Sequence, residues 1–128
     1  MYFLSILQRR IRSETGFTLI ELLVVLVIIG VLLAIAVPSY LGFKKRAEKH
    51  ASNSNVRSAI PSTEAYYSDN QTYAGMDLSA LQAIDQGVKS GLVVTVTGGG
   101  TGYTLSFTQG GCTSTGTGPG GSITNTCP

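Results

Sequence analysis

Few residues of this 128-residue chain have side chains that could do chemistry, and their spacing argues against catalysis. The one histidine, His50, has no cysteine or second histidine nearby, and no Ser/His/Asp arrangement can be assembled around it. The glycines at 98–100 lack the strand, helix and spacing of a dinucleotide-binding loop, and they predict a turn. The sequence therefore predicts a protein that is not an enzyme and that uses no cofactor or metal.

Cys112 and Cys127 are the only cysteines, and both lie near the end of a chain with features of export. An oxidising compartment favours a disulfide between them. Such a bridge would close a loop of about 15 residues and contribute about 3 kcal/mol to stability. The alternative is two unpaired thiols.

Glu21 is an acidic residue inside an apolar run, Phe17–Val37. As a helix this run is about 32 Å long, which matches a bilayer's hydrocarbon core of about 30 Å. An isolated charge in such a helix costs about 2.5–3.5 kcal/mol and needs a partner. Cleavage after Gly16 would create one, because the new amine of Phe17 is mostly cationic at neutral pH. The alternative is a polar residue tolerated near the membrane surface.

Residues 1–16 carry Arg9, Arg10 and Arg12 and end in glycine before the apolar run, which is typical of a targeting segment. The whole chain has nine basic and seven acidic residues, a formal net charge of +2. Removing residues 1–16 takes away three of the basic residues and one acidic residue, so the remaining charges cancel. This balance argues against an obligate nucleic-acid binder.

A second basic group follows the apolar run, so the flanking charges do not orient it in a membrane. We expect this group to be a solvated flank, with DNA or anionic lipid headgroups as alternative contacts. Its members are Lys44, Lys45, Arg46 and Lys49.

Beyond the apolar run, the helix is predicted to continue to about Tyr67 with a kink at Pro38. Pro61 predicts a second kink or a break. A stripe at helical spacing predicts a face that packs on a sheet. The stripe consists of Val56, Ala59, Ile60, Thr63, Tyr66 and Tyr67.

The C-terminal part of the chain reads as a loop followed by strands. Turn signals predict a connecting loop over 68–91, with only a short helical possibility around Leu78–Ile84. Leu92–Thr97 and Tyr103–Thr108 are rich in β-branched and aromatic residues and predict an antiparallel hairpin. The Gly/Thr/Ser-rich tail from Gly110 adds at best a short strand near Ser122–Thr126.

The junction Gly16-Phe17-Thr18-Leu19-Ile20-Glu21 resembles the class III signal of type IV prepilins and pseudopilins. That family has a short basic leader ending in glycine, then phenylalanine first and glutamate fifth after the cut. Gly30 and Pro38 fall where the family commonly has helix-softening residues. The motif resemblance covers residues 9–40, the stretch Glu64–Tyr73 is similar to the end of the family's long helix, and beyond Gly75 only the layout is alike.

Together these patterns predict an α+β, pilin-like fold with a long kinked N-terminal helix packed on a small antiparallel sheet and a disulfide-tied tail. The expected organisation is a leader over 1–16, a transmembrane and filament-core helix over 17–37, an amphipathic continuation over 38–67, a connecting loop over 68–91, and the sheet and C-terminal loop over 92–128.

The resemblance also implies how the protein is processed and where it acts. A prepilin peptidase would cut between Gly16 and Phe17 and methylate the Phe17 amine, and Glu21 would pair with Phe17 of a neighbouring subunit. Expected partners are other copies of the chain, this peptidase, and the platform and motor machinery. The subunit would be a single-pass protein of the cytoplasmic membrane before assembly and part of an extracellular pilus afterwards.

The predicted function is a structural subunit of a type IV pilus-like filament, for adhesion, motility or DNA uptake. The alternative is a pseudopilin of a type II secretion or competence system. No acidic residue follows Asp85, so the C-terminal loop lacks carboxylates for the calcium site of many major pseudopilins, which favours a pilus subunit.

Two further readings explain less of the sequence. Ala34-Ile35-Ala36 fits an ordinary signal-peptide site that would release a soluble secreted domain, but the apolar run is longer than such signals and contains Glu21. A membrane-anchored binding module leaves Gly16-Phe17 beside Glu21 unexplained. Asn70-Gln71-Thr72 fits a glycosylation acceptor, a pattern that is common by chance.

Overall fold

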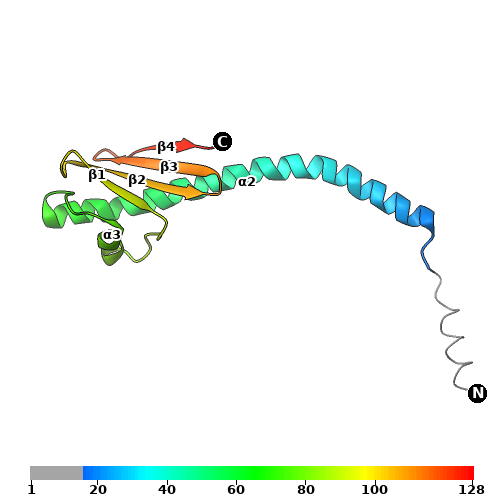
Figure 1. Cartoon of the computed structure of the whole chain (residues 1–128), viewed down its shortest axis with the longest axis horizontal. Coiled ribbons are helices and arrows are strands. Elements are labelled where there is room, and N and C mark those ends of the chain that lie inside the picture. Colours follow the sequence, from blue (N-terminus) through cyan, green and yellow to red (C-terminus); the bar gives the residue numbers. More distant parts are fainter. Residues whose placement is uncertain (1–15) are drawn as a thin grey trace, which may run out of the picture. The chain divides into compact units, whose positions relative to one another are not determined.

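The computed structural model describes residues 16–128, so the predicted leader lies outside the described residues except for Gly16. One long helix, an antiparallel sheet and a disulfide confirm the predicted pilin-like α+β fold. The chain divides into an N-terminal unit that ends at Tyr40 and a C-terminal unit, Leu41–Pro128. The elements (Figure 1) are α2 (Leu19–Asn70), α3 (Leu78–Ile84), β1 (Val93–Thr97), β2 (Gly102–Gln109), β3 (Cys112–Gly118) and β4 (Ser122–Thr126).

Helix α2 is continuous from Leu19 to Asn70 and passes through both Pro38 and Pro61. Of the two predictions for Pro61, the break is therefore wrong, and the second kink stays a prediction. Proline removes one backbone donor and crowds the preceding turn, but tertiary packing can hold the turns on either side. Ala59 and Thr63, which flank Pro61, are both 0% exposed, so packing in the C-terminal unit fixes the helix across this residue.

The predicted stripe on α2 forms the helix's packing face. Val56 and Ala59 belong to the core, and Ile60 and Tyr66 pack against it. Tyr67, predicted to be a core residue, is instead 39% exposed at the edge of this face. Its ring packs against Tyr73, with ring centroids 4.8 Å apart.

The four strands form an antiparallel sheet in the order β1-β2-β3-β4. The predicted hairpin is confirmed, with Val93 paired to Ser106 and Thr97 to Gly102. Its turn requires glycine, since the backbone φ angles of Gly98, Gly99 and Gly100 are 59°, 66° and 102°. The predicted strand at Ser122–Thr126 is confirmed as β4.

Strand β3 is the element that the sequence pattern did not predict. Its buried positions are Cys112, Ser114 and Gly116, so the alternation is present but only one of the three side chains is apolar. A Cβ at Gly116 would lie 2.7 Å from Cγ1 of Val56. Because this strand lies so close to α2, small residues take the positions that larger apolar residues fill elsewhere in a core.

The face of the sheet opposite to the one that packs on α2 consists mainly of threonine and serine. In one row across the sheet, Thr95 pairs with Thr104, Thr104 with Thr117, and Thr117 with Ser122. The hydroxyls of Thr108 and Thr113 lie 2.8 Å apart in another cross-strand pair. Threonine suits this face because it is β-branched and polar, and such pairs stabilise antiparallel sheets.

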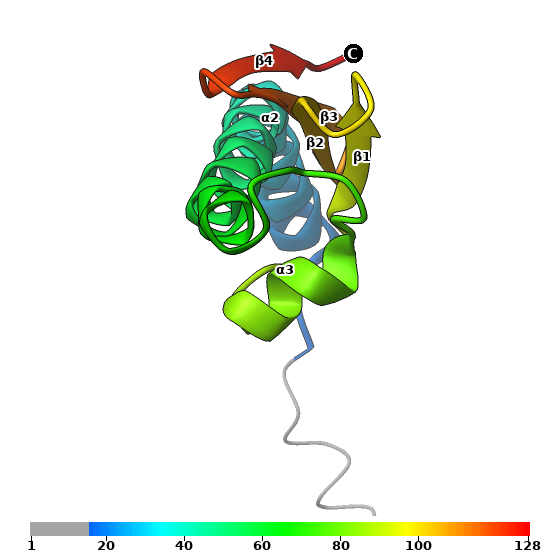
Figure 2. The same ribbon diagram turned by 90° about the vertical axis from the view of Figure 1, so that its left-hand side faces the viewer.

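The segment between α2 and β1 completes the core. Figure 2 shows α3 on the β1 side of the sheet, beside the C-terminal part of α2. Asp77 caps this helix by accepting a hydrogen bond from the Ala80 backbone N–H at 2.8 Å. The segment's buried core residues are Tyr73, Met76, Leu81, Val88 and Leu92.

Candidate functional site

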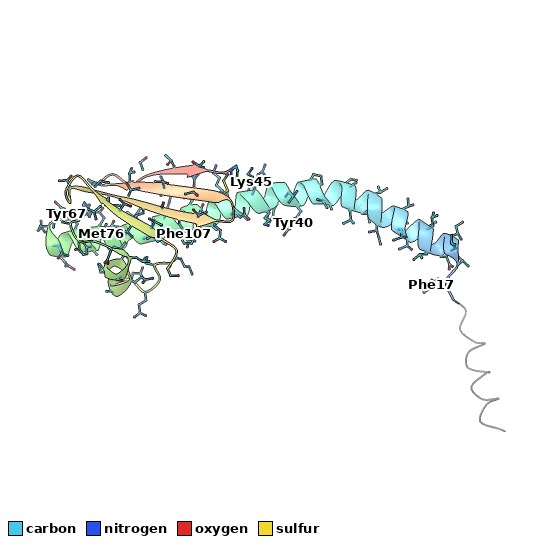
Figure 3. All side chains as sticks on the ribbon, in the orientation of Figure 1. Phe17, Tyr40, Lys45, Tyr67, Met76 and Phe107 are labelled. Atoms are coloured by element: carbon cyan, nitrogen blue, oxygen red, sulfur yellow. A yellow bond between two sulfur atoms is a disulfide. The ribbon has the colours of Figure 1, made fainter. Side chains whose placement is uncertain are left out.

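The predicted cleavage junction lies just before α2. Phe17 is 93% exposed, and a Cβ added to Gly16 would meet no atom within 4 Å. Figure 3 labels Phe17 near the start of the described residues. Nothing in the described structure therefore requires a glycine at position 16 for packing, and the bond is accessible to an enzyme.

Thr18 and Glu21 form a reciprocal cap at the start of α2. The Thr18 backbone N–H donates to Glu21 Oε2 at 2.9 Å, and the Glu21 N–H donates to Thr18 Oγ1 at 3.3 Å. This is a capping box, which satisfies two backbone donors that a helix start leaves unpaired. The pattern Thr-x-x-Glu before an apolar run is its sequence signal, and the sequence analysis missed it.

Within residues 16–128, nothing covers the apolar surface at the start of α2. Among the described residues, α2 is the one helix long and apolar enough to cross a membrane by length and composition, and none of its apolar window is buried. Phe17 and Glu21 line a shallow apolar groove with Ile20, Val24 and Val25. Glu21 and the residue whose amine would be released by cleavage therefore border the same groove.

Gly30 and Pro38, predicted to soften the helix, both lie inside α2. A Cβ at Gly30 would meet nothing within 4 Å, so no contact within the chain explains a glycine there. Their predicted role as kink sites remains a prediction.

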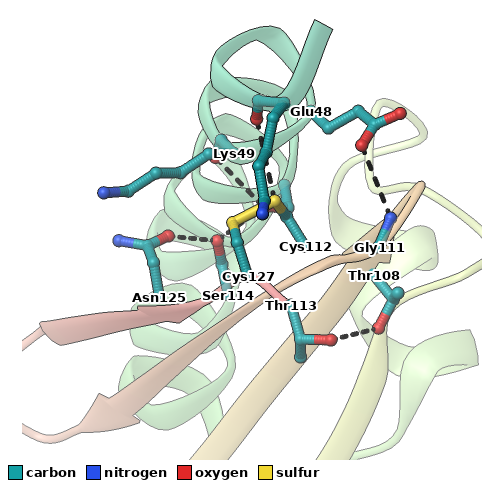
Figure 4. The surroundings of a disulfide bond; sticks show 11 residues. Glu48, Lys49, Thr108, Gly111, Cys112, Thr113, Ser114, Asn125 and Cys127 are labelled. Carbon is teal, nitrogen blue, oxygen red and sulfur yellow. Dashed lines mark hydrogen bonds between the residues drawn. A yellow bond between two sulfur atoms is a disulfide. The ribbon is translucent and has the colours of Figure 1, made fainter. Parts of the chain in front are cut away.

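The predicted disulfide between Cys112 and Cys127 is present and joins β3 to the residue after β4 (Figure 4). Cys112 is 1% exposed, and its Sγ lies 3.7 Å from the backbone carbonyl oxygen of Lys45 on α2. The Gly111 N–H points to Glu48 Oε2 at 3.5 Å. The disulfide therefore holds Cys127 and the neighbouring C-terminal residues close to α2.

A buried polar contact lies beside this disulfide. The hydroxyl oxygens of Ser52 on α2 and Ser114 on β3 are 2.7 Å apart, and Ser114 also bonds the Asn125 side chain of β4. Ser52 and Ser114 are both 0% exposed. Since buried hydroxyls must be paired, this contact aligns the helix with two strands.

A second polar cluster lies toward the other end of α2. The hydroxyls of Tyr73 and Tyr103 both donate to Glu64, at 3.2 and 3.3 Å to Oε1. Burial, followed by the Glu64 carboxylate, raises the pKa of Tyr73 to about 12. Burial also raises the pKa of Tyr103. The cluster thus joins α2, the following loop and β2.

The remaining residues considered for chemistry are dispersed. His50 is exposed on α2. Within residues 16–128 no three His, Cys, Asp or Glu side chains are grouped to hold a metal ion. In the same part of the chain the one ion pair joins Lys44 to Glu48 at 4.0 Å.

Helix α2 begins with a cap and an apolar stretch, and its later part packs on a disulfide-tied antiparallel sheet. This combination defines a pilin-like α+β class. Residues 11–37 match the family model described as the prokaryotic N-terminal methylation motif. This match covers the junction and the apolar run, and it confirms the motif predicted from the sequence.

The relatives include proteins of two kinds of machinery. The chain is 35% identical over 70 residues to the type II secretion system core protein G of Vibrio cholerae, covering 55% of this chain and 48% of that protein. It is 36% identical over 59 residues to the type IV major pilin protein PilA of Myxococcus xanthus, covering 46% and 27%.

A third relative is the type IV wide pilus major component PilA4 of Thermus thermophilus, 40% identical over 62 residues and covering 48% of this chain and 47% of that protein. The chain thus spans about half or less of the length of these relatives. No solved structure matches the chain.

Proposed function

We propose that this protein is a structural subunit of a type IV pilus-like filament. The observation that carries the proposal is the junction itself: an accessible Gly16-Phe17 bond, followed by a glutamate-capped helix whose apolar surface has no cover within the chain. The relatives named type IV pilins support it. The subunit would reside in the cytoplasmic membrane and then enter an extracellular filament.

Cleavage by a prepilin peptidase between Gly16 and Phe17 would release the Phe17 amine, which the same enzyme would methylate. Glu21 is suited to receive this amine from a neighbouring subunit. One of its carboxylate oxygens, Oε2, accepts the Thr18 N–H, and a carboxylate has further acceptor capacity on its second oxygen. The ion pair would remove the cost of an unpaired charge in an apolar bundle and fix the position of one helix against the next.

The apolar run would exchange lipid for other copies of the same helix. Because lipid tails are as apolar as leucine, this step is driven by packing and not by escape from water. Gly30, Ala34 and Ala36 are small residues that allow close helix approach. A head-to-tail contact of this kind produces an open helical polymer. The platform and motor machinery would supply insertion and extraction.

The second candidate is a pseudopilin of a type II secretion system, favoured by the core protein G relatives. The C-terminal unit argues for the pilus. It has no Asp or Glu after Asp85, so its C-terminal loops offer no carboxylate to a calcium ion.

The first test is the N-terminal mass of the protein from sheared surface filaments. We expect a methylated Phe17 terminus. A Gly16→Ala variant should keep its leader and give no filaments, and because a Cβ at position 16 meets nothing, this loss would reflect processing. Gly42→Ala, also with open space around the new Cβ, is the matched control for processing, and its N-terminal mass should show normal cleavage.

Two results would contradict the proposal. A terminus at Val37 would indicate an ordinary signal peptide and a secreted domain. An intact Met1 in the membrane of wild-type cells would leave only a membrane anchor.

A further inference from the structure

The charges of the C-terminal unit are separated along its length. Between residues 41 and 60 there are five basic residues and one acidic residue, Glu48, whereas between 61 and 88 there are four acidic residues and no Lys or Arg. We name the first cluster, Lys44, Lys45, Arg46 and Lys49, the basic end. We name the second set, Glu64, Asp69, Asp77 and Asp85, the acidic end.

The two ends are too far apart to neutralise each other. Lys45 and Glu64 are 19 positions apart in α2, which corresponds to about 28 Å along the helix axis. The Debye length at physiological ionic strength is about 8 Å. Figure 3 labels Lys45 and Tyr67 toward opposite ends of this unit. Within the described residues the single ion pair is internal to the basic region, between Lys44 and Glu48.

Apart from the pairing of Lys44 with Glu48, local contacts do not cancel the charges of either end. At the acidic end Asp77 and Asp85 accept backbone N–H bonds and Glu64 accepts tyrosine hydroxyls, all from neutral donors. Asp69 lies exposed near the end of α2. At the basic end the side chains of Lys45, Arg46 and Lys49 line an open groove with Asn125 and Cys127.

We infer that the basic end of one subunit docks against the acidic end of a second copy in the filament. This inference rests on the proposed function. A second copy fits better than an external polyanion, because the unit as a whole carries nearly as many acidic as basic residues and displays both signs. In a head-to-tail polymer unlike ends of identical units meet, and complementary charge selects their alignment. With parallel helices, the two copies would be offset by about 28 Å along the helix axis.

Charge-reversal variants with rescue test this docking in cells that assemble the filament. Lys45→Glu/Lys49→Glu reverses two of the four positive charges of the basic end. At the acidic end, Asp69→Lys reverses one charge, and Asp77→Asn removes a second while keeping an N-cap side chain for α3, since asparagine caps helices as well as aspartate. Each pair should lower the yield of sheared filaments about tenfold, and the combination of both should recover it to within about threefold of wild type.

The matched control for the basic-end variant is Arg57→Glu/Lys89→Glu, which makes the same change in net charge outside both ends and should leave the yield unchanged. Membrane levels and formation of the Cys112–Cys127 disulfide show whether each variant folds. Wild-type filaments should dissociate more readily at high salt, because screening weakens the contact between the two ends. Filaments of variants that lack this contact should respond less to salt.

The inference would be overturned if both reversed variants assembled like wild type, or if the combination did no better than the weaker parent. Loss confined to the basic-end variant would also overturn it and would indicate an anionic lipid or nucleic acid at that end. Failure of the proposed function is distinguishable, because wild-type protein would then form no filaments at all.

Discussion

At the scale of single residues, Glu21 accepts a hydrogen bond in its own helix and, in the proposed filament, receives an ion pair from another subunit. The two roles use different properties of the side chain. The cap needs a hydrogen-bond acceptor, which glutamine also supplies at this position of a capping box. The intersubunit pair needs the negative charge.

Substitution separates these roles. Glu21→Gln should retain the cap and cleavage at Gly16 but lower filament yield at least about tenfold, because the amine of Phe17 loses its counter-charge. Thr18→Ala removes the Thr18 Oγ1 acceptor, at a cost of about 1 kcal/mol to the helix start, and should still assemble. Sheared-filament yield and N-terminal mass measure both. If Glu21→Gln assembled as well as wild type, the negative charge would not be needed, and capping alone would account for Glu21.

At the scale of elements, the closest contact between α2 and the sheet is Val56 against Gly116. Gly116→Ala should destabilise the C-terminal unit by about 1–3 kcal/mol, because its Cβ would lie 2.7 Å from Val56 Cγ1. Val56→Ala should cost about 2 kcal/mol through a cavity. The new methyl group partly fills that cavity, so the double variant should be more stable than the sum of the two losses predicts.

Denaturant unfolding of the full chain in detergent micelles, followed by tyrosine circular dichroism, measures these effects. Gly42→Ala is the control, because its new side chain faces open space. Strict additivity of Gly116→Ala and Val56→Ala would show that the helix and β3 do not share this contact.

The elements that could be predicted from the sequence are those with a local pattern, and the others depend on tertiary contacts such as this one. The apolar run and the stripe containing Val56 show the helical period, and β1 and β2 carry β-branched and aromatic residues, so their types were predictable. Strand β3 buries serine and glycine because α2 lies close, and this proximity is a tertiary effect without a local signal. Similarly, Pro61 predicted a kink or a break, but packing on both sides keeps the helix unbroken.

The candidate site was predictable where its signal is local. Gly16, Phe17 and Glu21 are adjacent in a motif, and the Thr18 cap was readable from the same residues. The polar fastening by Glu48 and Ser52 was not predictable, because each reaches a partner more than 60 positions away. Cysteine count and export context predicted the disulfide. Its contact with α2, between Cys112 Sγ and the Lys45 carbonyl oxygen, is also long-range and was not predictable.

At the scale of the whole molecule, removal of the proposed leader would leave a subunit with equal numbers of acidic and basic side chains. Such a subunit has no net repulsion to overcome when many copies pack together, and the separated charges of the C-terminal unit remain available to align them. Stability of that unit then depends on contacts between distant segments. The Glu64, Tyr73 and Tyr103 cluster is one of them, since it joins α2 to the loop and to β2.

This cluster predicts how stability responds to alkaline pH. Folding raises the pKa of Tyr73 from 10.0 to about 12, chiefly by burial. Above about pH 10 the unfolded chain loses a proton that the folded chain keeps. The contribution of Tyr73 to stability is therefore fully present below about pH 10 and is lost as pH rises toward 12.

Tyr73→Phe keeps the ring and should cost about 1 kcal/mol at neutral pH through the lost hydrogen bond. It should also flatten the alkaline decline, which Tyr103 would still cause in part. Thermal unfolding in micelles from pH 8 to 11.5 measures this, with Tyr40→Phe at an exposed position as the control. An alkaline slope identical in Tyr73→Phe and wild type would show that Tyr73 ionises as freely in the folded protein as in the unfolded chain.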